Sequence, residues 1–494
     1  MKDANQVTRS LLDFVLAKVG TSMNLFHDEH GESYCEIVQE GSKHYMLLNS
    51  EEFRQWLSHE YYVGNGFLPL SKDLNSTIGF LSHKAKKECP ERKVYKRVGR
   101  SKNKKTIYLD LRRSDGVIVK ITRKGWKIVR SPKAAFHGST TSRPLPIPVD
   151  VDDNFDTFKI LKRYFNCTNQ DKLLLLTWII GTLKPDGPFP ILVLQGEAGS
   201  GKSTVAELLK NIIDPSVGPL RTLHESERDL MIACRNNWVL VFDNISRISE
   251  RTSNALCRLS TRGGLSTRQL YTDAEEVVFD MRRPLILNGI ANIINKPDLA
   301  DRAITVELKK LSDKRRRTVE ELFDSFRKDQ PRILGAICNA VATALKNKGK
   351  IQLNSHSRMA DFYEWVAAAE PAITRVKGRL LKEIMKNRRH MSRSSVEYDV
   401  LGAALKDFLK RHDGNWKGTH KELLDQLVSE LGDKESDQRV LKDEQWPKGA
   451  SKLSARLKEL APSLRNIGIE YTHVMNRGRK LLTITMKKRR SKKK

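Results

Sequence analysis

One glycine-rich segment carries the residue types that hold a phosphate chain. Residues 196–204 read Gly-Glu-Ala-Gly-Ser-Gly-Lys-Ser-Thr, a full G-x-x-x-x-G-K-[ST] pattern. Glycines let backbone N–H groups approach a β-phosphate, and the N-terminus of a following helix adds its dipole. Lys202 would reach the β- and γ-phosphates, and the Ser203 hydroxyl would bind Mg²⁺. The segment predicts a site for ATP and Mg²⁺ in which the nucleotide contacts Gly196, Gly199, Ser200, Gly201, Lys202, Ser203 and Thr204.

The flanking sequence supplies the context that this pattern needs. The segment follows an apolar strand, Ile191–Leu194, and opens a predicted helix, Thr204–Ile213. A second apolar strand, Trp238–Phe242, ends in Asp243, an acid placed to hold the Mg²⁺ sphere.

Asn244 stands where helicase-type ATPases usually place a glutamate that activates water. An amide is no general base, although it can orient a water molecule. The sequence leaves open whether Asp243 serves twice or another acid acts. The candidates are Glu225, Glu227, Asp229, Glu275 and Glu276.

Two further polar residues lie at the ends of apolar strands, Asn288 after one strand and Arg302 near the start of another. The strand Pro284–Leu287 ends in Asn288, which could touch the γ-phosphate or its attacking water, or could simply be a turn residue before Gly289. Arg302 could pair with Asp298 or Asp301, or act as an arginine finger on a neighbouring subunit's nucleotide. We interpret Lys202, Asp243, Asn288 and Arg302 as the catalytic set.

This order of motifs resembles the AAA+ ATPases, and more closely the superfamily 3-like replicative helicases of phages, plasmids and integrative elements. Four stretches are similar to one mobile-element ATP-binding family: LILNGI, DLADRAI, LCRLSTRGGLSTRQLYTDAEE and RMADF. The resemblance spans about residues 26–389 and implies an α/β fold with a P-loop AAA+-type core in a ring-forming, DNA-translocating ATPase, with a hexamer expected. It also implies that Lys202, Asp243, Asn288 and Arg302 are the Walker A lysine, the Walker B acid, the sensor and the finger, and that Arg358 is a second γ-phosphate sensor.

The segment between the Asp243 and Asn288 strands contains a turn signal. Gly263-Gly264 predicts a hairpin turn. Related ring helicases project a basic hairpin here into a central channel, where Arg262 and Arg268 would grip the phosphates of single-stranded DNA. The alternative is a structural turn with solvated arginines.

Charge points to a nucleic-acid partner. The 494 residues contain 89 Lys+Arg and 59 Asp+Glu, a net charge of +30. Such an excess repels itself unless a polyanion offsets it. A composition of 39% hydrophobic and 30% charged residues excludes wholesale disorder, and six scattered cysteines without a C-x-x-C pair argue against a zinc module. We read neither a signal peptide nor a spanning segment, and we expect a cytoplasmic protein with no membrane partner.

The patterning predicts several units. Residues 1–136 form an α+β domain that we expect to bind DNA or support assembly, since the clustered carboxylates of a primase are missing. Its expected elements are a helix, Glu51–Tyr62, a strand pair, Tyr34–Val38 and Tyr45–Leu48, and four basic strands, Val94–Val98, Ile107–Leu111, Val117–Ile121 and Trp126–Val129. Residues 137–153 form a linker, 154–317 the ATPase core (with one more apolar strand, Leu220–Leu223), 318–395 a helical lid, 396–486 a winged-helix-like domain and 487–494 a basic tail.

The C-terminal unit has the features of a DNA-binding module. Thr419 to Glu422 form a capping box, and a second helix over residues 449–460 carries Lys448, Lys452 and Arg456 in one outer row. Two strands, Ile469–Met475 and Lys480–Met486, flank a basic tip with Arg477 and Arg479. We expect this unit to bind duplex or origin DNA. A small α+β domain with ordinary solvated lysines is the alternative.

These features favour an ATP-dependent DNA helicase or translocase acting in the replication of a phage or mobile element. The alternatives are a DNA-binding initiator or loader that uses ATP as an assembly switch, and a P-loop ATPase of a defence system.

Overall fold

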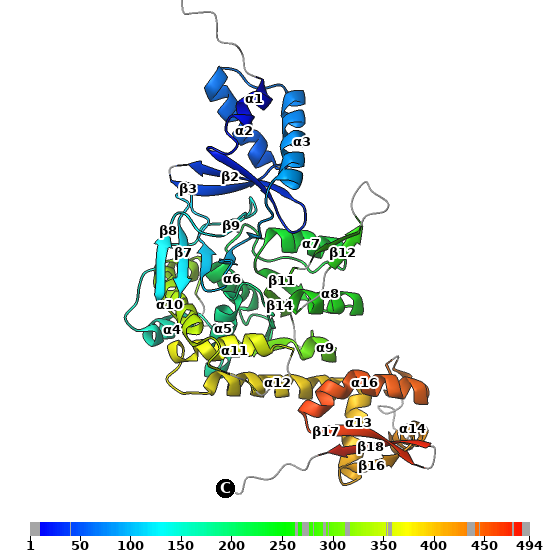
Figure 1. Ribbon diagram of the computed structural model, residues 1–494. Helices are drawn as coiled ribbons and strands as arrows, with labels where there is room; N and C mark the ends of the chain where they lie inside the picture. The colour runs from blue at the N-terminus through cyan, green and yellow to red at the C-terminus, as the bar shows by residue number, and fades with distance from the viewer. Residues whose placement is uncertain are drawn as a thin grey trace, which may run out of the picture.

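The computed structural model is a mixed α/β structure with several separate sheets (Figure 1). It describes residues 10–39, 41–261, 265–268, 276–279, 281–289, 293–294, 296–311, 317–351, 353, 358–431, 440–443, 445–476 and 479–486. Within these ranges no helix is long and apolar enough to cross a membrane.

A four-stranded parallel sheet forms the centre of the molecule. Its order is β11-β14-β10-β15, with β10 Ile191–Gln195, β11 Leu240–Ile245, β14 Leu285–Gly289 and β15 Ala303–Glu307. The three apolar strands predicted at Ile191–Leu194, Trp238–Phe242 and Pro284–Leu287 are confirmed as β10, β11 and β14. The predicted strand Leu220–Leu223 is wrong, because only Arg221 pairs there, in a single parallel bridge to Phe242.

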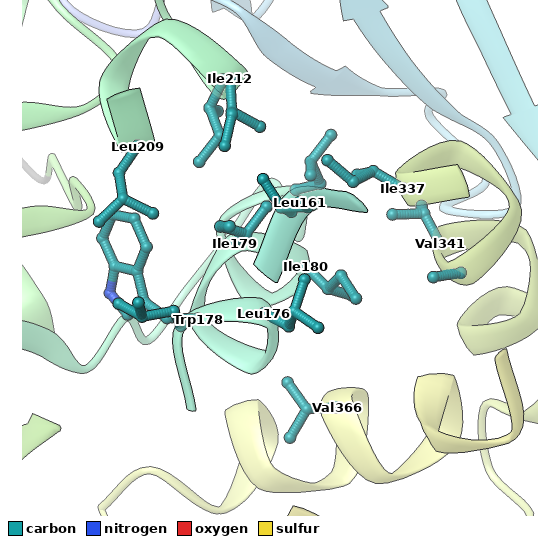
Figure 2. Packing of buried hydrophobic residues seen from close by; sticks show 14 of the residues in the cluster. Leu161, Leu176, Trp178, Ile179, Ile180, Leu209, Ile212, Ile337, Val341 and Val366 are labelled. Atoms are coloured by element: carbon teal, nitrogen blue, oxygen red, sulfur yellow. The ribbon is translucent and has the colours of Figure 1, made fainter. Parts of the chain in front are cut away.

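Helices cover both faces of this sheet. They are α4 Asn154–Lys162, α5 Asn169–Thr182, α6 Lys202–Ile213, α7 Glu227–Asn236, α8 Glu250–Ser260, α9 Pro297–Ala300, α10 Val319–Asn347 and α11 Ala360–Ala369. Helix α5 is buried on every side from Leu173 to Thr182, which explains its unbroken apolar sequence. Figure 2 shows Trp178 of α5 beside Leu209 of α6, with Ile337 and Val341 of α10 in the same cluster.

The N-terminal residues form a separate small unit, drawn at the top of Figure 1. A three-stranded antiparallel sheet of β1 Met23–His27, β2 Ser33–Gln39 and β3 Ser42–Leu47 is joined by the helices α1 Leu11–Leu16, α2 Glu51–Asn65 and α3 Ser71–Glu88. The expected strand pair and the helix after Ser50 are confirmed. Strand β1 and helix α3 were not anticipated.

The basic strands that follow pack onto the central core. They are β5 Val98–Arg100, β6 Ile107–Asp110, β7 Ile118–Thr122 and β8 Gly125–Val129, while β4 Val94–Tyr95 leaves this sheet to pair with β9 Ala135–Phe136. Their buried side chains belong to the same hydrophobic cluster as β10 and α10, and Trp126 donates to Asn339 of α10 at 2.8 Å. The core is therefore continuous across residue 136.

Residues 137–153 are extended and packed. Leu145 is buried, and its N–H donates to the Leu111 carbonyl at 2.9 Å. The Val149 N–H donates to Pro331 of α10, where Gly335 leaves room for the Val149 carbonyl. Residues 137–153, which were expected to be a linker, thus form a segment that packs against α10.

A long helix, α12 Arg379–Tyr398, joins the core to the C-terminal unit (Figure 1). The Asn387 amide accepts from the Thr305 N–H of β15 at 3.0 Å and donates to the Thr305 carbonyl at 2.6 Å. Arg388 pairs with Asp301, which lies between α9 and β15. The helix thus runs unbroken through the serine-rich stretch at the expected end of the lid.

The C-terminal unit consists of α13 Val400–Arg411, β16 Asn415–Gly418, α14 His420–Leu431, α16 Ala450–Asn466, β17 Ile469–Asn476 and β18 Arg479–Met486, with sheet order β16-β18-β17. The capping box is confirmed: the Glu422 N–H donates to Thr419 Oγ1 at 3.2 Å, and the Thr419 N–H donates to Glu422 Oε2 at 2.7 Å.

A two-stranded hairpin lies between β11 and β14 in the chain. Strands β12 Leu265–Arg268 and β13 Glu276–Phe279 pair antiparallel, with Leu265 opposite Phe279. This register places the connection of the hairpin between residues 268 and 276, and the expected turn at Gly263-Gly264 stays a prediction. The glycine pair, Arg262 and Glu275 lie outside the described residues.

One buried carboxylate joins three parts of the fold. Asp214, at the end of α6, accepts from Arg97 Nε at 3.0 Å and from the Trp238 and Val239 N–H groups at 2.8 and 3.0 Å. Lys210 lies 3.5 Å from it and donates to the Val239 carbonyl at 2.8 Å. Asp214 therefore connects α6 to the start of β11 and to the basic sheet.

We expect Asp214→Asn to destabilise the protein by about 3–5 kcal/mol, because it leaves two buried cations without a counter-charge. Burial alone would raise the pKa of Asp214, but Lys210 and Arg97 outweigh it and hold that pKa below its ordinary value. The stabilisation is therefore present at neutral pH and is lost as pH falls through the folded-state pKa. Urea unfolding at pH 7 and pH 3 should show a difference from wild type that narrows in acid. The exposed Asp156→Asn serves as the control, and equal effects of the two variants would contradict this role.

Candidate functional site

The glycine-rich segment forms a tight loop between β10 and α6. Gly196, Gly199 and Gly201 have φ of +151°, +75° and +77°, conformations that favour glycine. A Cβ on Gly196 would lie 2.5 Å from the Leu308 carbonyl oxygen. Helix α6 begins at Lys202, so its N-terminus points into the loop.

Two polar side chains of the loop face inward. Lys202 Nζ donates to the carbonyls of Gly196 and Glu197, both at 2.9 Å. Ser200 is buried, and its Oγ has no hydrogen-bond partner among the described residues. The ammonium therefore lies over the loop, where a phosphate would sit against the helix N-terminus.

Three side chains from three elements meet beside this loop. Ser203 Oγ of α6 donates to Asp243 Oδ1 of β11 at 3.1 Å. Asn288 Nδ2 of β14 donates to the same carboxylate oxygen and to Ser203 Oγ at 3.2 Å. Parallel strands bring their carboxyl ends to one edge of a sheet, and β14 lies between β10 and β11.

The oxygen pair suits a magnesium ion. Mg²⁺ requires octahedral oxygen ligands at roughly 2.0–2.1 Å, which sets neighbouring ligands roughly 3 Å apart. Ser203 Oγ and Asp243 Oδ1 have that separation, and both residues are reached by solvent. Asn288 Oδ1 is buried without a partner among the described residues, so it can accept a hydrogen bond from a water on the ion or at the phosphate.

The acid that would activate water is not evident beside Asp243. Asn244 is exposed with φ of +56°, and its N–H donates to Asp243 Oδ1 at 2.9 Å. Glu227 is engaged with Arg258 of α8 at 2.9 Å and with Arg251. Glu225 and Asp229 lie around the start of α7, and Glu276 lies in β13, whose side chains are not described.

Arg302 and Arg358 lie together, away from the loop. Arg302 Nη1 donates to the Asp298 carbonyl at 2.8 Å and pairs with its carboxylate, and Arg358 Nη1 reaches the same carboxylate at 2.6 Å. Ile191 pairs with Ala303 and Gln195 with Glu307, so Arg302 is at the opposite end of this strand pair from the loop, roughly 13 Å along the strand. Arg358 as a second γ-phosphate sensor stays a prediction, and in this structure its guanidinium pairs with Asp298.

The residues expected to bind DNA are dispersed. Lys448 and Lys452 are exposed, but Arg456 pairs with Asp399 and Glu459 and so ties α16 to the start of α13. Arg456 thus has a structural role, and its contact with DNA stays a prediction. Arg268 and Arg479 lie in strands whose side chains are not described, and Arg477, like Arg262, lies outside the described residues.

Asp298 is the site residue that sequence reasoning undervalued. Its i,i+4 spacing to Arg302 was visible, but its second partner is sixty positions along the chain. Burial alone would raise the pKa of Asp298, yet its hydrogen bond to Arg302 and the charges of both arginines hold that pKa below its ordinary value.

Comparisons with known proteins match two stretches of the chain. Residues 158–379 match a family described as actinomycete integrative conjugative element replication protein, and residues 401–493 match the AICE RepA C-terminal domain. No curated protein matches. Two solved apo structures of the NrS-1 C terminal region are similar at 12% and 11% identity, each with a TM-score of 0.38, over 97% and 98% of this chain and 99% and 100% of theirs. At that TM-score the likeness carries no argument.

We expect Gly196→Ala to weaken ATP binding roughly tenfold or more, because the loop must distort to relieve both the φ of +151° and the contact with Leu308. Titration with a fluorescent ATP analogue measures the loss. Gly218→Ala is the matched control, since Gly218 also has positive φ but has open space around its Cβ position. Unchanged ATP affinity in the Gly196 variant would remove the loop from the binding site.

Proposed function

Taking the chain as a replication protein of an integrative conjugative element, which its two family matches indicate, we propose that it is an ATP-driven DNA translocase of the AAA+ type that unwinds DNA as a ring. The observation that carries the proposal is the meeting of Lys202, Ser203, Asp243 and Asn288 at the carboxyl ends of adjacent parallel strands.

Each of these residues has one task toward bound ATP. The loop N–H groups and Lys202 hold the β- and γ-phosphates, with the ammonium moving from the loop carbonyls to the phosphate oxygens. Ser203 and Asp243 would hold Mg²⁺, which supplies positive charge against the charge that develops during phosphoryl transfer. Asn288, fixed by its bond to Asp243, orients the attacking water through its unpartnered Oδ1.

The placement of Arg302 supports assembly into a ring. A side chain at the far end of the β10–β15 pair cannot act on the nucleotide of its own chain, whereas a neighbouring subunit can bring its own copy there. Asp298 orients the guanidinium of Arg302, whose side chain is 9% exposed. This arrangement supports a finger acting between subunits.

Three features support DNA as the polymer that is moved. The net charge is +30, and the β12–β13 hairpin is inserted between β11 and β14, the strands that carry Asp243 and Asn288. The C-terminal unit has the helices and the strand hairpin of a winged-helix-like module, with Lys448 and Lys452 exposed. Phosphate contacts of this kind position a protein on DNA without reading its sequence.

An assembly switch remains the second candidate, and Asn244 favours it. Where helicase-type ATPases usually carry a glutamate, this chain exposes an amide. ATPase measurements with and without single-stranded DNA separate the two functions. Stimulation by DNA supports the translocase, and slow turnover that ignores DNA supports the switch.

We expect Lys202→Ala to lower ATP turnover by about 10²–10³-fold, because the γ-phosphate loses its fixed cation. Asp243→Asn should lose Mg²⁺-dependent turnover for the matching reason on the metal side. Steady-state ATPase across a Mg²⁺ series measures both. Lys159→Ala removes an exposed lysine of α4 and should behave as wild type. Near-normal turnover in the Lys202 variant would refute the assignment.

Arg302→Ala should bind ATP but hydrolyse it about 10³-fold more slowly, as expected for a lost finger. Mixing it with Lys202→Ala protein should restore activity, because some interfaces then combine an intact Lys202 with an intact Arg302. A mixture of Lys202→Ala with the Lys202→Ala/Arg302→Ala double variant contains no such interface and is the control. Equal activity of the two mixtures, in rings shown to exchange subunits, would exclude action between subunits.

A further inference from the structure

A cleft of about 350 Å³ lies between the N-terminal unit and the central core, apart from the phosphate loop. Its volume falls within the range of small-molecule sites, roughly 300–1,000 Å³. Strand β2 and the loop before it form one wall, and α7 with the start of β11 forms the other; these elements lie side by side in Figure 1. We define this interdomain cleft by Tyr34, Lys96, His137, Arg235, Trp238 and Arg283.

Four carboxylates line the cleft, and three of them have cationic partners, whereas Asp28 accepts from the N–H groups of His30 and Glu32, both at 2.9 Å. Glu32 pairs with Arg235 across the cleft at 2.7 Å, and Glu29 pairs with Lys93 at 3.5 Å. Asp186 pairs with Arg100, which lies outside the lining. Asp28 is therefore the lining carboxylate that acts on Lys96, and its effect is weaker than that of the surrounding arginines.

Lys96 is the cation without a partner. Within the described part of the chain its ammonium makes neither a hydrogen bond nor an ion pair. Arg283 also lines the cleft, but its guanidinium is held by the carbonyls of Cys234 and Asn237 at 2.9 and 3.0 Å. Lys96 is half-buried, so an anion that enters the cleft can pair with its ammonium.

Burial and the surrounding arginines together lower the pKa of Lys96. Burial lowers the pKa of Lys96 first, and Arg283, Arg235 and Arg112 lower it further, to about 7, against the weaker opposing effect of Asp28. Burial likewise lowers the pKa of His137 to about 4, with Lys96 and Arg112 adding to the shift, so the imidazole is neutral at pH 7. An anion beside Lys96 would reverse these effects and draw a proton onto the amine.

The rest of the lining suits a nucleotide. Ile232 of α7 is 49% exposed, and together with Tyr95 and Met281 it gives the cleft an apolar side where a base could lie. The lining residues Met281 to Arg283 follow directly after the hairpin strand β13, so the cleft opens at the root of the proposed DNA hairpin.

We propose that the interdomain cleft binds one nucleotide unit, with its phosphate on Lys96 and its base against the apolar side. The unit comes either from single-stranded DNA, which rests on the proposed function, or from a free nucleotide. In both cases the phosphate pairs with the Lys96 ammonium through a charge-assisted hydrogen bond.

The test is calorimetric titration of the full chain at pH 7.5 with oligo-dT and with dTMP, in two buffers of different ionisation enthalpy. Wild type should take up roughly three-quarters of a proton per site, the neutral fraction of an amine with a pKa of about 7. Lys96→Met should lose that uptake and bind roughly tenfold more weakly. Lys96→Arg should bind without uptake, because arginine does not titrate in this range. Lys102→Met, an exposed lysine outside the cleft, should match wild type.

Proton uptake with oligo-dT alone identifies a DNA strand, and uptake with dTMP identifies a free nucleotide. The proposal is overturned if wild type takes up no proton with either probe, or if Lys96→Met retains both the uptake and the affinity. The ATPase of the Lys202 variants reports on the phosphate loop and not on this cleft, so failure of one proposal is distinguishable from failure of the other.

Discussion

The buried charge cluster around Asp214 is the constraint on which the other parts depend. The Asp214 carboxylate at the end of α6 accepts hydrogen bonds from the N–H groups of Trp238 and Val239 and from the Arg97 guanidinium. The same guanidinium also donates to the carbonyls of Asp110, Arg143 and Pro215. The helix that begins at Lys202 and the strand that carries Asp243 are thus joined at their far ends. Ser203 lies at the start of α6, and Asp214 holds the other end of the same helix against the Trp238 N–H. The contact at Asp214 therefore helps to fix the distance between Ser203 and Asp243. A buried ion pair gains little net stability, but it specifies one relative position for three segments.

Helix α12 connects the central core to the C-terminal unit in the same way, through hydrogen bonds and ion pairs. Helix α12 bonds β15 through Asn387, α9 through Arg388 and α16 through Ser392, which accepts from Asn466 at 2.9 Å. Arg302, Asp298 and the C-terminal unit are therefore attached to one helix. A movement of α12 together with the C-terminal unit would therefore also move β15 and the neighbouring Arg302.

Site residues can be predicted from the sequence where they belong to one contiguous motif. They are predicted less well where their partners lie far away along the chain. The phosphate loop and Asp243 could be found because each follows a recognisable apolar strand, and Asn288 because parallel strands end at one edge. For Arg456, the spacing reveals its own helix but not its ion pair with Asp399 at the start of α13. The serine-rich stretch of α12 reads as a break, yet Ser392 and Ser395 are buried against neighbouring elements, so tertiary packing overrides local preference. The interdomain cleft combines residues from positions 28 to 283 and has no local signal at all.

Asn387 has one more consequence, which concerns the open side of the central sheet. Strand β15 is an edge strand, and an edge strand with unpaired N–H and C=O groups is a template for another chain. The Asn387 side chain occupies both outward groups of Thr305, as a passing strand would. An amide on a helix cannot extend the ladder further. The sheet is thereby closed to strand addition at the position where crowded copies of the chain would otherwise aggregate.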